Sequence, residues 1–529
     1  MTRQTVITLC LSLMVVATAG CFGDSSGAED YYPEHDATYD SMPYDAAADT
    51  AGDSLPLPDA PPDTSESDAA TDTDAVEDAD DEDAEPPNVC DEEIDEPQVL
   101  YLSADDSNSQ ASPVYARKMI EQGRIVPWYS VRTYEFLNYY NLSYELPEQG
   151  RVTVVAQMQP DPDPEEDGLY NLQIGVQGHH MGEDMRRPMN VTFSLDTSGS
   201  MSGDPINLLK AVCRQIAANL REGDVVSMVI WSDTQAVTLE SHVVSGPDDD
   251  ELLDAISRLE SGGSTNLHAG LVTAYELAEA NYREGWLNRV VLISDGQANT
   301  GETDHDLIAA HADDSEREGI YLVGVGTGNG YDDTLMDTVT DKGKGAYIFI
   351  DSEEEAVKMF GEKFVSSMEI AVMDVQVQLT IPPVLRMEVF YGEEVSGNPK
   401  EVEPQHLAPD DAMIYQLSLR SCWELGEEDT IKAVASYVDP ATRAGRTDSF
   451  EANALDLLEG ASVQLGKGYA IVAYAEALKE IDKTADISEQ AQLCSDAKAK
   501  VDAAAAALDD DDLDEISSLL ETYCRLFGG

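Results

Sequence analysis

The chain has 529 residues, and its 104 Asp and Glu residues outnumber its 31 Lys and Arg residues, which gives a formal net charge of -73. This charge disfavours nucleic acids as partners, and docking on anionic lipid through a basic patch, because phosphate groups would be repelled. The apolar fraction of 42% suffices for hydrophobic cores, and the length predicts several domains.

The first 21 residues have the pattern of an export signal. Arg3 precedes an apolar run at residues 6–17 that is too short to span a bilayer, and small residues then lead to Cys21. The segment resembles a bacterial lipoprotein signal, which implies that Cys21 is acylated. We therefore expect a lipoprotein anchored in the bacterial cell envelope, at the outer membrane or cell surface. A secreted protein with an ordinary cleaved signal peptide is the alternative.

Residues 22–98 form an acidic segment with 27 Asp and Glu residues and no Lys or Arg. Such a segment cannot bury enough apolar surface to offset the entropy that it would lose on ordering. We expect a disordered acidic linker, which acts as a stalk between the membrane and the folded part of the chain.

The five cysteines that follow the signal are Cys90, Cys213, Cys422, Cys494 and Cys524. Their odd number leaves at least one thiol unpaired, and Cys213 is the candidate because it lies on the apolar face of an expected helix. Cys494 and Cys524 lie in successive helical segments and could form a disulfide in an oxidising compartment. No spacing of Cys and His indicates a zinc site.

The remaining chain falls into four segments. Residues 99–188 contain two helical stretches and then alternating strands, whereas residues 189–368 alternate apolar strands with amphipathic helices. The second pattern predicts an α/β fold with a doubly wound, mostly parallel sheet that is covered on both faces. Residues 369–455 have the alternation of an antiparallel sandwich, and residues 456–529 form a helical C-terminal region. From their shared strand pattern we expect 99–188 and 369–455 to pack together, with 189–368 inserted between them.

Oxygen-bearing side chains gather in three loops of the 189–368 segment. They are Asp196, Ser198 and Ser200 at the end of one strand, Thr265 in a glycine-rich loop, and Asp295 at the end of another strand. Open α/β sheets bind ligands at the carboxyl ends of their parallel strands. Carboxylate and hydroxyl oxygens suit Mg²⁺ or Mn²⁺ and leave room for water or an external ligand.

These three loops together resemble the metal-ion-dependent adhesion site (MIDAS) of the von Willebrand factor type A (VWA) domain, in which D-x-S-x-S is followed by a loop Thr and a loop Asp. The resemblance implies a Rossmann-like VWA fold and a bound Mg²⁺, or else Mn²⁺ or Ca²⁺. It implies that the metal ligands are Asp196, Ser198, Ser200, Thr265 and Asp295, the last directly or through water. Runs within residues 112–145 and 326–351 are similar to the bacterial YfbK-like group of VWA lipoproteins.

The function implied by this resemblance is cell adhesion, in which a protein partner supplies an acidic residue that completes the coordination of the metal. One alternative is a structural envelope protein whose metal only stabilises the fold. Another is a metal-dependent hydrolase, because a metal with open coordination can activate water. A general base could then come from Glu302, Asp304 or His305, although a charged helix start also explains these residues. We expect no catalytic residues.

Overall fold

The computed structural model describes residues 89–91, 94–162, 166, 168–299, 319–328, 330–460 and 462–528. The expected signal peptide with Cys21 and the expected linker up to residue 88 lie outside the described residues. The candidate bases Glu302, Asp304 and His305 lie outside them as well. Within the described ranges, no helix combines the length and the apolarity that crossing a bilayer requires.

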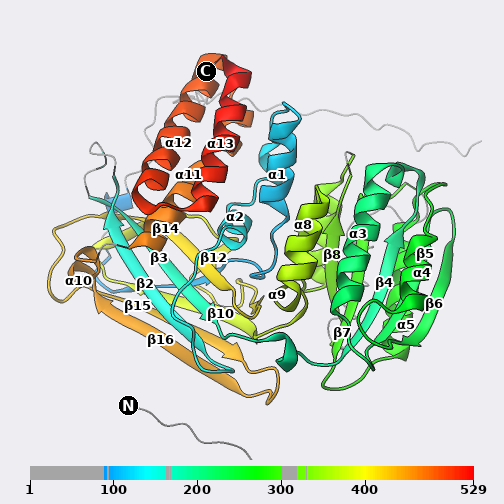
Figure 1. Cartoon of the computed structure of the whole chain (residues 1–529). Helices are drawn as coiled ribbons and strands as arrows, with labels where there is room; N and C mark the ends of the chain where they lie inside the picture. The colour runs from blue at the N-terminus through cyan, green and yellow to red at the C-terminus, as the bar shows by residue number, and fades with distance from the viewer. Residues whose placement is uncertain are drawn as a thin grey trace, which may run out of the picture. The chain divides into compact units, whose positions relative to one another are not determined.

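Two antiparallel sheets share one hydrophobic core (Figure 1). The first has the order β12-β1-β10-β15-β16, with β13 also paired to β10; its strands are β1 (Gln98–Ser103), β10 (Val372–Ile381), β12 (Glu394–Ser396), β13 (Gln405–Leu407), β15 (Thr430–Val438) and β16 (Gly445–Asn453). The second has the order β11-β14-β3-β2; its strands are β2 (Val152–Pro160), β3 (Leu169–Gly178), β11 (Leu385–Phe390) and β14 (Ala412–Ser421).

Each of these sheets combines strands from both flanks of the 189–368 segment. In the first sheet β1 pairs with β10, and in the second β3 pairs with β14 over nine residues. Leu172 of β3 and Val377 of β10 are buried in the same core between the sheets. The strand pairing therefore confirms that the two flanks pack together, as their shared alternation predicted.

A third sheet has the order β6-β5-β4-β7-β8-β9. Its strands are β4 (Met189–Asp196), β5 (Val225–Trp231), β6 (Gln235–Val243), β7 (Leu287–Ser294), β8 (Tyr321–Gly326) and β9 (Tyr347–Phe349). All neighbours are parallel except β5 and β6. The predicted doubly wound sheet is confirmed. The edge strand β6 was not predicted, because most of its side chains are exposed and its sequence lacks the apolar run of a buried strand.

Helices cover both faces of the third sheet. Val291 and Ile293 of β7 pack in one core with α3 (Asp204–Asn219), α4 (Asp250–Ser257), α8 (Glu353–Val357) and α9 (Phe364–Met368). Val290 and Leu292 point to the other face and pack with α5 (Leu267–Ala280) and α7 (Asp333–Lys342). This alternation explains why the run of residues 290–293 in β7 is apolar throughout.

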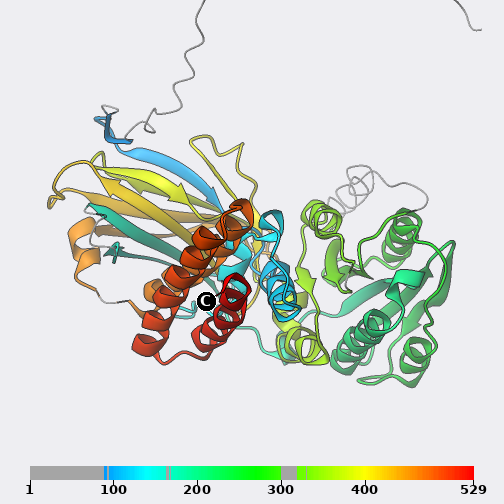
Figure 2. The ribbon, with the colours of Figure 1, turned by 90° about the horizontal axis from the view of Figure 1, so that it is seen from above.

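The C-terminal region is helical, as predicted. Its helices are α10 (Ala454–Leu458), α11 (Val463–Lys483), α12 (Ile487–Leu508) and α13 (Asp511–Cys524). Of these, α13 lies beside α1 (Ala111–Glu121) in both ribbon views (Figures 1 and 2).

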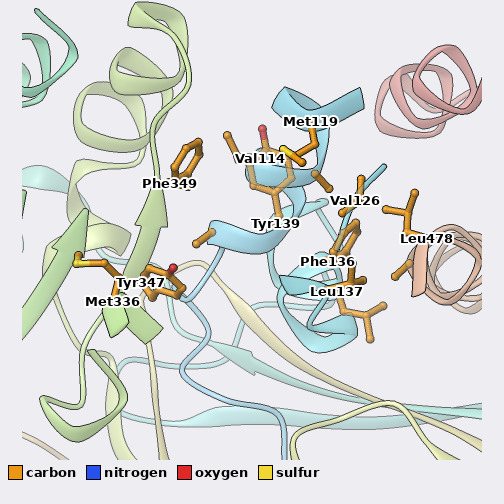
Figure 3. Close-up of a cluster of buried hydrophobic side chains, with 14 of the residues drawn as sticks. Val114, Met119, Val126, Phe136, Leu137, Tyr139, Met336, Tyr347, Phe349 and Leu478 are labelled. Atoms are coloured by element: carbon orange, nitrogen blue, oxygen red, sulfur yellow. The ribbon is translucent and has the colours of Figure 1, made fainter. Parts of the chain in front are cut away.

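The helices α1 and α2 (Thr133–Tyr139) join the third sheet to the C-terminal helices through a continuous core. Figure 3 shows Phe136 of α2 beside Leu478 of α11, while Tyr347 and Phe349 of β9 approach from the other side. The ring of Tyr115 lies 5.4 Å from that of Phe349, centroid to centroid. The core of the 189–368 segment is therefore not closed by that segment alone.

A buried ion cluster reinforces this junction. The guanidinium of Arg132, just before α2, donates to both carboxylate oxygens of Asp333 in α7, at 2.7 and 3.0 Å. Arg132 also donates to Glu135, and Tyr347 donates to Asp333 at 2.8 Å. All four residues are buried, so the cluster fixes α2 against α7.

The structure confirms the expectations for Cys213, Cys494 and Cys524. Cys494 and Cys524 form a disulfide between α12 and α13, and Cys213 is a buried free thiol. Cys90 forms a disulfide with Cys422, 332 residues away. The last part of the segment expected as linker is therefore attached covalently to the sandwich, which its acidic composition did not indicate.

Stability is expected to fall as pH rises, in part because of one buried carboxyl. Asp106 is 3% exposed, and burial raises its pKa to about 7, although the amide of His406 donates to it. The folded state therefore holds a proton that the unfolded state releases near pH 4, so stability is lost between these two values. Between pH 5 and pH 7.5, we expect the free energy of unfolding of Asp106→Asn to fall by about 2 kcal/mol less than that of the parent protein. Urea unfolding at both pH values measures this difference. Equal losses in the two proteins would contradict this assignment.

Candidate metal centre

The three loops with oxygen-bearing side chains meet at one edge of the third sheet. Asp196 is the last residue of β4, and Asp295 follows the last residue of β7. These strands are parallel neighbours, and the chain continues from β4 to β5 on one side and from β7 to β8 on the other. The loops therefore lie at the point where the strand order reverses, which is where open α/β sheets leave a crevice for ligands.

The first loop is organised around the carboxylate of Asp196, which is 0% exposed. The amide of Ser198 donates to its Oδ1 at 2.8 Å, and the hydroxyl of Ser294 donates to its Oδ2 at 2.7 Å. The hydroxyl oxygens of Ser198 and Ser200 are 3.0 Å apart. Alternate residues of this loop thus place one carboxylate and two hydroxyls next to one another.

The second loop is bonded to the first through its glycines. The amide of Gly199 donates to the carbonyl of Gly263 at 2.9 Å, and the amide of Gly262 donates to the carbonyl of Thr197 at 2.8 Å. Gly263 has a φ of +89°, and a Cβ built on it would lie 2.9 Å from an oxygen of Asp233. This position therefore requires glycine. The two backbone hydrogen bonds between these loops place the loop that carries the buried Thr265 against the loop of Asp196.

The third loop completes the cluster. The hydroxyl of Ser200 in the first loop partly offsets the effect of burial on the pKa of Asp295. Asn299 binds Thr265 of the second loop: its Oδ1 accepts from the amide of Thr265 at 2.9 Å, and its own amide donates to the carbonyl of Thr265 at 3.1 Å. All five residues singled out in the sequence therefore belong to one group of mutually bonded loops.

The electrostatics of this group suit a divalent cation. Burial raises the pKa of Asp196 to about 6 in spite of hydrogen bonds from Ser294 and Ser198, and the neighbouring Asp295 raises it further. Burial also raises the pKa of Asp295. In the described part of the chain no Lys, Arg or His forms an ion pair with either carboxylate. Two buried carboxylates beside hydroxyls, without a positive partner, make a donor set that fits Mg²⁺.

The composition of the group differs from that of sites built on His, Cys, Asp and Glu alone. Among the residues that the structure describes, no three side chains of those four types cluster as a metal site. Here hydroxyl groups supply three of the five oxygen donors. Ser200 is exposed, whereas the other four residues are buried, so the group opens to solvent beside Ser200.

Two residues of the site were not singled out from the sequence. Ser294 donates to Asp196, and Asn299 connects Thr265 to the third loop. The signal for Ser294 was its place at the end of β7, directly before Asp295. Asn299 had no such signal, because only the path of the loop after β7 brings it to Thr265.

Comparisons with known proteins identify a family for this part of the chain. Residues 190–363 match the family model of the von Willebrand factor type A domain, and residues 94–169 match a model described as von Willebrand factor. The chain is similar to the protein YfbK of Escherichia coli, with 26% identity over 303 residues, which is 56% of this chain and 52% of YfbK.

Further similarities are weaker. The protein sll0103 of Synechocystis is 22% identical over 218 residues, which is 41% of this chain and 51% of that protein. The chain thus spans about half the length of each of these two relatives. A solved structure of a von Willebrand factor type A protein from Catenulispora acidiphila has a TM-score of 0.44 and 17% identity, and covers 73% of this chain and 91% of its own.

Proposed function

Residues 190–363 form a VWA domain, and from this premise we propose that the protein binds a protein partner through a divalent metal at the bacterial cell surface. Domains of this family commonly mediate protein–protein interactions, sometimes through a MIDAS metal. The observation that carries the proposal is the bonded group of loops around the buried carboxylate of Asp196.

In this proposal five side chains hold the cation, Mg²⁺ or else Mn²⁺ or Ca²⁺: Asp196, Ser198, Ser200, Thr265 and Asp295. Five protein oxygens would leave the sixth position of an octahedral Mg²⁺ open, and an anionic ligand could bind there. An acidic side chain of the partner can approach from the solvent side, where Ser200 is exposed. The metal would supply a position at which the acidic side chain of the partner binds, and no catalytic residue takes part.

The proposal places the protein outside the cell membrane as a lipoprotein anchored through Cys21. The lipoprotein-like signal at residues 1–21 and the acidic stalk after it support this placement. The two disulfides support an oxidising compartment, in which such bonds persist.

Capture of a partner from envelope extract tests the proposed function. We expect the immobilised protein to retain a specific protein in Mg²⁺, to lose it in EDTA, and to regain it when Mg²⁺ is restored. If Mg²⁺ raises the melting temperature but nothing is retained, the metal serves only the fold, as in the structural alternative. Retention that EDTA leaves unchanged would contradict the metal-dependent mechanism.

A further inference from the structure

A small cavity lies at the amino ends of β7 and β8, at the edge of the third sheet opposite the metal centre. Its volume is about 190 Å³, and the first residues of both strands contribute to its lining. Arg187 and Ile370 line it as well, and they belong to the stretches of chain that enter and leave the 189–368 segment. The cavity therefore lies where this segment joins the two antiparallel sheets.

Positive charge gathers around this cavity, although the chain as a whole has a net charge of -73. Three arginines line it, Arg187, Arg289 and Arg443, and among the described lining residues Glu284 is the one acid. Arg187 is already paired, because its Nε donates to Oε1 of Glu369 at 3.1 Å and its Nη2 donates to Oε2 at 2.6 Å. The guanidinium groups of the other two arginines have no carboxylate of this kind.

Arg289 is buried without an acceptor for the end of its side chain. It is 3% exposed, its Nε donates to the carbonyl of Met368 at 2.9 Å, and its Cζ lies 5.1 Å from the ring centroid of Tyr321. Neither Nη1 nor Nη2 donates a hydrogen bond to a described residue. Nη1 is fully enclosed, but Nη2 is not. Because Arg289 lines the cavity, Nη2 is the unpaired donor that a bound molecule can contact.

The environment of Arg289 lacks a negative charge in direct contact. Burial lowers its pKa to about 10, and the positive charge of Arg187 also lowers it. Buried charges in folded proteins are paired, so an unpaired guanidinium beside a cavity indicates an anionic ligand. The contacts with Met368 and Tyr321 hold the guanidinium in one direction before any ligand binds, which reduces the entropy lost on binding.

Arg443 adds a second donor from the turn between β15 and β16. It is exposed, and its Nη1 lies 3.3 Å from Sδ of Met373. A thioether is a weak acceptor, so this guanidinium can turn to a stronger one. Trp286, Ile370 and Pro440 are among the apolar residues of the same lining. The cavity thus offers two positive donors beside apolar surface, which suits an anion with a hydrocarbon part.

We propose that this cavity binds a small organic carboxylate with an apolar body, of the size of benzoate. One carboxylate oxygen accepts from Nη2 of Arg289, and the other accepts from the guanidinium of Arg443. The hydrocarbon body packs on Trp286 and Ile370. The volume is below the range of pockets for drug-sized ligands, which limits the body to about one ring. This site is independent of the metal centre.

Titration calorimetry of the full chain with benzoate tests this proposal, with benzamide and inorganic phosphate as comparison ligands. Benzamide keeps the ring without the charge, and phosphate keeps a charge without the ring. At about 0.15 M salt, where exposed charges are screened, we expect saturable binding of benzoate that is about tenfold tighter than that of either comparison ligand. Equal or tighter binding of benzamide or of phosphate would overturn the assignment. Absence of saturable binding would overturn it too, and would show that the cavity holds water only.

Two variants test the residues. Arg289→Met is expected to weaken benzoate binding by at least about tenfold, and Arg443→Asn by about tenfold. Arg443 has a φ of +54°, which asparagine tolerates, so Arg443→Asn tests the site even if Arg289→Met fails to fold.

Arg283→Gln is the matched control for both variants. Arg283 lies 4.2 Å from the ring centroid of Trp286 but does not line the cavity, so the variant removes the same charge nearby. We expect it to change the affinity for benzoate by less than about threefold. Binding that neither Arg289→Met nor Arg443→Asn changes would overturn the proposal, and so would an equal loss in Arg283→Gln.

Discussion

Asp196→Ala is expected to weaken Mg²⁺ binding by at least about 100-fold. Loss of a group that only orients a metal ligand costs up to about 100-fold in affinity, and a direct ligand is expected to matter more. In the structure Asp196 lies at the centre of the group, because it accepts from Ser198 and Ser294 and lies beside Asp295. Titration calorimetry with Mg²⁺, repeated with Mn²⁺, measures the loss.

The control for this variant is Asp233→Asn. Asp233 accepts from the amide of Ser264 at 2.7 Å beside the same loops, is exposed, and is not a proposed ligand. Like Asp196→Ala, the variant Asp233→Asn removes one negative charge from this edge of the sheet. We expect it to weaken Mg²⁺ binding by less than about threefold, which is the size of a screened surface effect. If both variants lose affinity equally, the cation is held by the general negative potential of this edge and not by the proposed ligands.

A second substitution of Asp196, to Asn, separates metal binding from folding. Asp196 is a buried carboxylate whose burial disfavours its ionised form, so Asp196→Asn is expected to be at least as stable as the parent in EDTA at pH 7.5. In Mg²⁺ only the parent gains stability, because ligand binding stabilises the state that it binds. Thermal unfolding in the two buffers measures this pattern. A variant that melts far below the parent in EDTA would show that Asp196 has a structural role instead.

Arg132→Met is expected to lower the free energy of unfolding by about 3–5 kcal/mol. The substitution leaves the carboxylates of Glu135 and Asp333 buried without their positive partner. Glu135 is 0% exposed, and burial already raises its pKa to about 7 even with Arg132 present. Urea unfolding followed by circular dichroism measures the difference. The loss is expected to shrink at pH 5, because Glu135 is then protonated in the folded state and needs no counter-charge.

An exposed ion pair provides the matched comparison. Asp254 lies in α4, and Arg258 follows the end of this helix one turn later. Both side chains are 70% exposed. Arg258→Met is therefore expected to change stability by less than about 0.5 kcal/mol. A small effect of Arg132→Met, similar to that of Arg258→Met, would show that α2 is held against α7 by apolar packing alone.

The alternation of apolar strands with amphipathic helices in residues 189–368 could be predicted from the sequence. The pattern is clear in β5, because buried parallel strands are nearly continuous apolar runs. The strands β6 and β16 were not predicted. In each of them most side chains face solvent at least in part, so hydrophobic patterning is weak.

The sequence by itself determined the local chemistry: a strand that ends in Asp196, hydroxyls at alternate positions after it, and the order of the other two loops. It could do so because side-chain alternation and turn preferences act over a few residues. Only the tertiary structure decided which distant segments meet, as in the pairing of β1 with β10, the disulfide of Cys90 with Cys422, and the contact of Asn299 with Thr265. In such contacts the sequence of one segment contains no pattern that identifies the other segment. The contacts form because the fold as a whole buries apolar surface that many elements share.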